Sequence, residues 1–186
     1  MDYIQTTSIE THLDHNSTPE ALAKSYDDWS GTYDEEIMTQ LNCTGPRKCA
    51  ETMEKVMGGS NLKEVRVLDV AAGTGLCAEE LVKKGFTNID AVDGSQKMLY
   101  LAEKKQIYRR LICDFVGPNP LDIEKGGYIV ITFREEWLHL YEDFKDKLEP
   151  AMARLQEQGL WDRVNREIFS NYYQGKDGIT IVYKVL

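Results

Sequence analysis

Three aspartates, Asp69, Asp93 and Asp114, stand at or near the ends of three short apolar runs of the sequence. The first is followed two residues later by a turn of small residues, 71–75 (AAGTG), where the backbone can approach a ligand closely. Ligands of open α/β sheets bind beyond the carboxyl ends of the strands. The spacing therefore predicts that the three carboxylates meet around one glycine-rich turn and bind a ligand there.

Two ligand classes compete for such a site. Gly73, Gly75 and Ala78 satisfy a dinucleotide fingerprint, and Asp93 follows Gly73 at the distance of a ribose-binding acid. A pyrophosphate is a dianion, however, and Asp69 beside its cradle would repel it. S-adenosylmethionine (SAM) has no phosphate, and it offers carboxylates a cation, a ribose diol and an adenine amino group. The three acids therefore favour SAM over a nicotinamide dinucleotide.

The hydrophobic pattern supplies a sheet that would hold these acids. Short strand-like runs alternate with helical segments through residue 115, and this alternation is typical of a doubly wound α/β fold. A fourth strand and a long amphipathic helix from residue 137, kinked or restarted at Pro150, follow. The last two strands flank the turn 174–178 and are expected to pair antiparallel. The expected strands are 65–70, 88–93, 110–115, 128–133, 164–173 and 179–185.

An aromatic face precedes the first strand. Tyr26, Trp29 and Tyr33 lie at i, i+3 and i+7, so they share one side of a helix if the helix that Ser17 caps continues through Gly31. Such a face either packs on the core or covers a ligand, and the spacing fits both interpretations.

Composition restricts the partners. The chain has 186 residues, 22 Lys and Arg against 31 Asp and Glu, and a net charge of −9. This acidic balance argues against nucleic acid and against an anionic membrane surface. The N-terminal residues show no signal-peptide pattern, and the four cysteines and three histidines have no metal-ligand spacing. We therefore expect a cytoplasmic protein with reduced thiols and no metal.

Residues 67–75 (VLDVAAGTG) resemble motif I of class I SAM-dependent methyltransferases, and residues 92–99 (VDGSQKML) resemble motif II. More narrowly, several stretches resemble the methyltransferase-like proteins named for the Williams–Beuren syndrome chromosomal region. Those stretches are 26–34, 49–51, 132–136, 147–150, 159–161 and 182–185. The resemblance covers the chain from about residue 20 and implies one methyltransferase-like domain at 17–186. Residues 1–16 are polar and aperiodic, so we expect a loose tail there.

The resemblance implies a role for each site residue. Asp69 would contact the methionine amino end of SAM, with Gly73 and Gly75 letting the backbone approach and Ala71 replacing the usual first glycine. Ribose, adenine and methionine contacts would come from further residues. Asp93, with Gly94 and Ser95 in motif II, would hold the ribose; Met98, Asp114 and Phe115 would surround the adenine; and Tyr26, Trp29 and Tyr33 would form part of a lid. No catalytic residue is assigned, because methyl transfer mainly requires placement of the acceptor.

The family pattern implies seven strands, but the block that contains the fourth is missing between residues 115 and 126. We therefore expect a Rossmann-like, mostly parallel sheet of six strands, with 128–133 moved beside 65–70 and a C-terminal antiparallel pair. The predicted function is methyl transfer from SAM to a small molecule or a protein, impaired by this loss. A SAM-binding or inactive protein that acts through a partner is the alternative. The sequence leaves the oligomeric state open.

Overall fold

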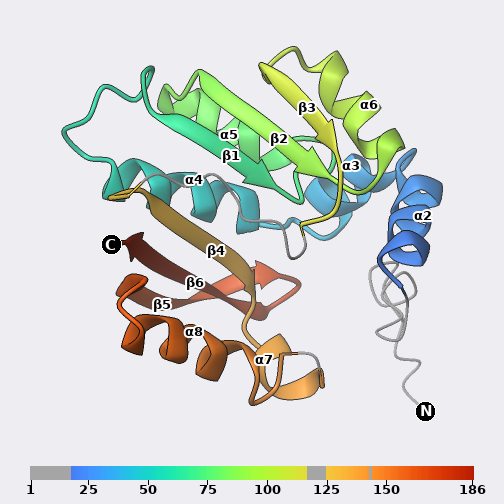
Figure 1. Ribbon diagram of the computed structural model, residues 1–186. Coiled ribbons are helices and arrows are strands. Elements are labelled where there is room, and N and C mark those ends of the chain that lie inside the picture. The colour runs from blue at the N-terminus through green and yellow to red at the C-terminus, as the bar shows by residue number, and fades with distance from the viewer. Residues whose placement is uncertain (1–17, 117–124, 143) are drawn as a thin grey trace.

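The structure is a computed structural model that describes residues 18–116, 125–142 and 144–186 (Figure 1). The expected tail at 1–16 lies outside the described residues. The helical segments are α2 (Pro19–Trp29), α3 (Tyr33–Glu35), the π-helical turn η1 (Glu36–Gln40), α4 (Gly45–Val56), α5 (Leu76–Lys84), α6 (Gln96–Lys104), α7 (Trp137–Leu140) and α8 (Leu148–Glu157). The strands are β1 (Arg66–Val70), β2 (Asn88–Asp93), β3 (Arg110–Cys113), β4 (Tyr128–Arg134), β5 (Trp161–Tyr173) and β6 (Lys176–Val185).

Strands β1, β2 and β3 form a parallel sheet in that order, as the alternation of strands and helices predicts. Val67 and Ile89 on one face pack against α4 and α5, where Leu81 is buried. The opposite face is bare by comparison, because Leu68 and Val70 are 37% and 43% exposed. The parallel sheet is therefore covered by helices on one side only among the described residues.

Strands β4, β6 and β5 form a separate antiparallel sheet in the order β4-β6-β5. Phe133 and Ile181 pack with Met152 of α8 in a buried cluster, so α7, α8 and this sheet form one layer. The predicted C-terminal antiparallel pair is confirmed, and both of its strands are longer than expected.

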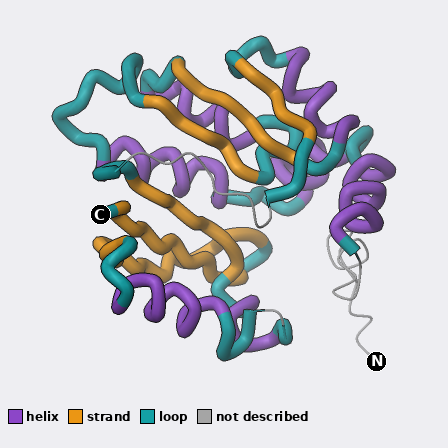
Figure 2. Tube along the Cα trace, viewed as in Figure 1, coloured by secondary structure: helices purple, strands orange, loops and turns teal. Residues whose placement is uncertain are grey.

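The prediction of one six-stranded sheet is wrong. Residues 128–133 do not pair with 65–70, and Figure 2 shows the strands in two groups with α4 between them. Helix α4 packs on α5 and on β4, and Ala50 is fully buried there. For β4 to reach β1, its whole layer with α7 and α8 would have to move and this packing would break. The backbone of β1 faces a cavity instead, where water can satisfy its polar groups.

Three helix boundaries also differ from the predictions. Thr18 caps α2, accepting from the backbone N–H of Ala21 at 3.3 Å, and α2 ends at Trp29 rather than continuing through Gly31. The long helix expected from residue 137 is divided into α7 and α8, because Tyr141 is extended. Pro150 neither kinks nor restarts a helix, since it lies in the first turn of α8, where its missing N–H costs nothing.

Candidate functional site

The turn between β1 and α5 adopts the left-handed conformations that glycine favours. Gly73 and Gly75 have φ of 56° and 91°, and Ala71 has φ of 56°. A side chain at such a φ costs about 1–2 kcal/mol, so Ala71 carries strain that a glycine would avoid. The turn is held to β2 by a hydrogen bond of 3.3 Å from Ala72 N–H to the carbonyl of Val92.

Asp93, at the end of β2, connects the turn to α6. Its Oδ2 accepts from the N–H of Gly73 at 2.8 Å, and its Oδ1 accepts from the N–H of Ser95 at 2.8 Å. Ser95 is buried and caps α6 by accepting from the N–H of Met98 at 3.1 Å. Each carboxylate oxygen has a second lone pair, so Asp93 can also accept from a ligand diol.

Asp69 is half-buried on β1, where it lines a cavity. Its Oδ2 accepts from the hydroxyl of Tyr108 at 2.7 Å, and burial raises the pKa of this carboxyl to about 6, despite that hydrogen bond. The Tyr108 ring also lies against Gly75, where an added Cβ would be 3.1 Å from it. Sequence reasoning missed Tyr108, which stands between α6 and β3 and belongs to no motif. A cation placed beside Asp69 would relieve the cost of its buried charge.

Of the remaining motif residues, Gly94, Asp114 and Phe115 lie at the carboxyl ends of β2 and β3, and Met98 lies in α6. The Phe115 ring rests on Gly94, where an added Cβ would be 2.4 Å from it, and 42% of Phe115 is exposed. Asp114 is exposed and accepts from the N–H of Phe115 at 2.8 Å. Met98 is buried at 1% exposure, so it supports α6 from within the core.

The aromatic residues meet although they come from two helices. The rings of Trp29 and Tyr33 are 4.7 Å apart between centroids in an edge contact, and Tyr26 stacks on Trp29 at 6.0 Å. The indole N–H of Trp29 donates to Glu36 at 3.0 Å. Burial, and secondarily the charge of Asp93, raise the pKa of Tyr26, so this cluster lies within electrostatic reach of the site.

Two further acids attach these helices to the site. Asp27 accepts from the Ser95 hydroxyl at 2.5 Å and from the N–H of Lys97 at 3.0 Å. Asp34 accepts from the hydroxyl of Thr74 in the turn and from Lys105 at 3.0 Å. Their partners are 40 to 71 positions away in the sequence, so no local pattern could have identified these contacts.

A cavity of about 1270 Å³ extends from the turn into the space between the two sheets. Its lining includes Asp69, the turn residues 71–74 and the aromatic cluster Tyr26, Trp29 and Tyr33 at one end. It continues along β1 and β4 past Thr132. Asp93, Asp114, Phe115 and Met98 are not part of this lining. The structure thus places Asp69 and Asp93 at one turn and puts Asp114 on the neighbouring strand end.

Within the described ranges, no group of three or more His, Cys, Asp or Glu is arranged to hold a metal ion. All four cysteines are free. None of the described helices is long and apolar enough to cross a membrane.

Comparison with known proteins decides the family. Residues 67–159, half of the chain, match the family described as Methyltransferase domain. The chain belongs to this methyltransferase domain family. A curated relative from Homo sapiens, Methyltransferase-like protein 27, is 29% identical over 167 aligned positions, which cover 74% of this methyltransferase-family chain and 66% of that protein. The chain therefore spans 66% of the length of the relative it matches.

Solved structures share the fold of this methyltransferase-family chain. A S-adenosylmethionine-dependent methyltransferase from Clostridium acetobutylicum has a TM-score of 0.56 and 16% identity, covering 86% of this chain and 98% of that one. Magnesium protoporphyrin IX methyltransferase from Synechocystis PCC 6803 with bound SAM has a TM-score of 0.63 and 11% identity. The match covers 94% of this chain and 100% of that one. The predicted methyltransferase-like α/β fold is thereby confirmed, apart from the arrangement of its sheet.

Proposed function

We propose that this chain binds SAM at the edge formed by the carboxyl ends of β1, β2 and β3. The observation that carries the proposal is the position of Asp93, which joins the glycine-rich turn to the capped start of α6 through two hydrogen bonds of 2.8 Å. A carboxylate held in this way is pre-organised to accept from both hydroxyls of a ribose. The family match supports the same ligand, as does the shared fold of the Synechocystis methyltransferase, whose structure holds bound SAM.

The neighbouring residues suit the other parts of SAM. Asp69 is enclosed and would stabilise the ammonium of the methionine half, with the aromatic cluster of Tyr26, Trp29 and Tyr33 as part of a lid. Asp114 and the exposed ring of Phe115 are available to the adenine edge and face. Gly73, Gly75 and Ala71 shape the turn, and Gly94 and Ser95 shape the start of α6. Met98, expected against the adenine, is buried in the core and would support that side of the site from behind.

The proposed reaction is methyl transfer to a small-molecule or protein acceptor. The sulfonium of SAM is itself the electrophile, so the protein's task is to align an acceptor and exclude water. The cavity between β1 and β4 exceeds the usual 300–1,000 Å³ of ligand sites. We therefore expect slow turnover in this form, because so open a space excludes water poorly.

A SAM-binding protein without turnover is the second candidate, and the same cavity favours it. We also propose that the chain is related to the methyltransferase-like proteins of the Williams–Beuren region, and that it is located in the cytoplasm.

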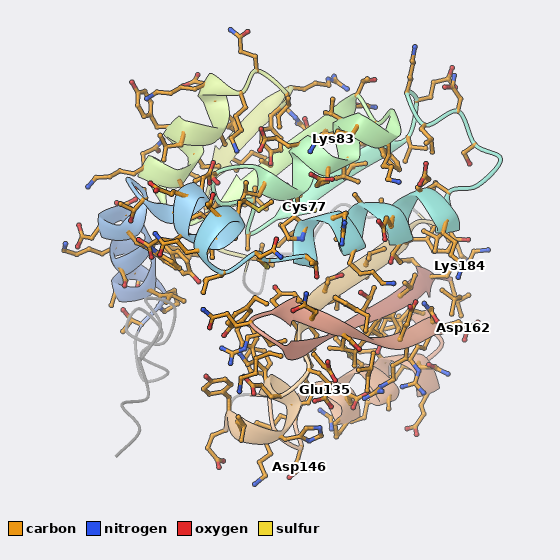
Figure 3. The ribbon with its side chains drawn as sticks, turned by 180° about the vertical axis from the view of Figure 1, so that it is seen from behind. Cys77, Lys83, Glu135, Asp146, Asp162 and Lys184 are labelled. Atoms are coloured by element: carbon orange, nitrogen blue, oxygen red, sulfur yellow. The ribbon has the colours of Figure 1, made fainter. Side chains whose placement is uncertain are left out.

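Calorimetric titration with S-adenosylhomocysteine, NAD and NADP tests the ligand. We expect binding of S-adenosylhomocysteine alone, and tight binding of NAD would refute the proposal. Asp93→Ala should weaken S-adenosylhomocysteine by about 1.5–3 kcal/mol, the contribution of hydrogen bonds to a charged group. Asp162→Ala is the matched control, because Asp162 is exposed on β5, in the other layer (Figure 3). Unchanged affinity in Asp93→Ala would remove the ribose assignment.

A further inference from the structure

One end of the cavity contains a buried cation whose hydrogen-bonding capacity is mostly unused. Arg134, the last residue of β4, is 3% exposed and lines the cavity. Its Nη2 donates to Glu136, but its Nε and Nη1 have no hydrogen-bond partner among the described residues. Buried donors are almost always paired, and leaving one unpaired costs about 1–3 kcal/mol. An arginine in this state is therefore suited to an acceptor that arrives with a ligand.

A second orphaned donor lies three residues further along the chain, at the start of α7. Trp137 also lines the cavity, and its buried indole N–H has no acceptor within the part of the chain that the structure describes. The other two tryptophans are paired, since Trp29 donates to Glu36 at 3.0 Å and Trp161 donates to the carbonyl of Met152 at 2.9 Å. Trp137 therefore differs from the other two tryptophans, whose indole N–H groups both have an acceptor.

The charges around Arg134 indicate an anion of single charge. Glu136 accepts from Arg134 and also from Lys176, the latter at 2.9 Å. Arg134 therefore shares its one carboxylate partner with Lys176, whose side chain is half exposed and hydrated. A monoanion would complete the pairing of the guanidinium, whereas a phosphate dianion would leave a negative charge in a low-dielectric place. A carboxylate meets this requirement and matches the planar guanidinium.

The unpaired donors of Arg134 and Trp137 lie toward the same end of the molecule as the glycine-rich turn, where we propose that SAM binds. Strands β1 and β4 run in the same direction in Figure 1, so Arg134 and the turn after β1 are at corresponding ends. The guanidinium is 4.8 Å from the ring centroid of Tyr173, which is buried in the same cluster as Trp29. Figure 3 places Glu135, the neighbour of Arg134, in the lower layer and Cys77 in the upper one.

We infer that this cavity binds an organic acid with an apolar body, whose carboxylate is held by Arg134, with the indole N–H of Trp137 as a second donor in the same cavity. The apolar part would lie along the hydrophobic lining contributed by Leu68, Val70 and Val130. This inference rests on the proposed function in one respect: it names the class of the methyl acceptor. The site itself requires only the cavity and the donors.

The probe is 2-naphthoate, with the neutral 2-naphthamide as its isostere, each titrated into the full chain without cofactor. We expect the acid to bind about tenfold more tightly than the amide, the effect of one charge-assisted hydrogen bond. Arg134→Gln should abolish this preference. Arg110→Gln is the matched control, because Arg110 lines another part of the cavity and is paired with Asp90. Equal affinity of acid and amide, or a preference that survives Arg134→Gln, would overturn the inference.

The indole N–H resonance of Trp137 gives a second readout in the unaltered protein. Trp137→Phe assigns the resonance, and 2-naphthoate should shift it downfield while the resonances of Trp29 and Trp161 remain in place. If Arg134→Gln does not fold, Arg134→Lys keeps the charge and should retain a weaker preference for the acid. Loss of S-adenosylhomocysteine affinity in either Arg134 variant, equal to the loss for 2-naphthoate, would assign the arginine to the cofactor and refute the acceptor site. Failure of Asp93→Ala to affect S-adenosylhomocysteine would instead refute only the proposed function.

Discussion

Replacing Asp69 by asparagine should stabilise the free protein at neutral pH. The carboxylate is enclosed on β1, and burial raises its pKa from the ordinary 3.8 to about 6, although Tyr108 donates to it at 2.7 Å. At neutral pH the folded protein therefore pays to keep this group ionised, whereas the unfolded chain does not. Asparagine keeps the shape and an acceptor oxygen for the tyrosine, and it removes the charge.

The size of the effect follows from the two pKa values. A carboxyl with a raised pKa in the folded state destabilises the protein above that pKa and ceases to do so as the pH falls below the unfolded value. A shift of about 2 units corresponds to about 3 kcal/mol at full ionisation. Between pH 4.5 and pH 7.5 the wild type should therefore lose about 2 kcal/mol of unfolding free energy relative to Asp69→Asn.

Urea denaturation of both proteins at these two pH values measures the difference directly. Asp162→Asn serves as the control, because the carboxyl of Asp162 is exposed and its removal should change neither curve. S-adenosylhomocysteine should bind Asp69→Asn less tightly, since its ammonium loses a charged partner. A destabilised Asp69→Asn at pH 7.5, or a difference independent of pH, would show that Asp69 is not held as an enclosed ionised group.

Three further predictions concern the turn, the adenine edge and the cavity. Ala71→Gly should stabilise the protein by about 1 kcal/mol in urea denaturation, because φ is 56° there, and a loss of stability would contradict the assigned conformation. Gly94→Ala should displace the Phe115 ring and weaken S-adenosylhomocysteine in calorimetry with little change in melting temperature, while unchanged affinity would separate this ring from the adenine. Insertion of a fourth-strand block between residues 116 and 125 should raise the rate of methyl transfer. The rate is measured as S-adenosylhomocysteine formed from SAM in the presence of an acceptor such as 2-naphthoate. Full turnover by the unaltered chain would show that the block is dispensable.

The local features of the site could be predicted because their causes are local. A small-residue turn between an apolar run and a helix dictates the left-handed conformations at Gly73 and Gly75. The serine at position 95 caps a helix wherever its chain neighbours form one. Parallel neighbours β1 and β2 then bring Asp69 and Asp93 to the same edge. The expected continuous helix through Gly31 is absent, but the break between α2 and α3 still leaves the rings of Trp29 and Tyr33 in contact.

The contacts between distant segments could not be predicted. Asp27, Asp34 and Tyr108 each bind a site residue through a side chain whose partner lies about 40 positions away or further. The spacing of these three residues in the sequence does not predict their partners. The partners depend on how α2, α3 and the chain before β3 pack on the sheet. The same holds for Arg134, whose Nε and Nη1 have no partner among the described residues at the point where β4 ends beside the cavity.

The sequence alone determined the strand–turn–helix units, the acids at the strand ends and the family, since each depends on residues close together in the chain. The tertiary structure alone decided the arrangement of the sheet. Local pattern predicts that residues 128–134 form a strand, but a strand can pair on either edge, and its partner is set by the packing of whole layers. Here the pairing of β4 with β6, the cluster around Phe133 and the contact of α4 with both layers fix β4 away from β1. The result is a parallel sheet, an antiparallel sheet and the cavity between them.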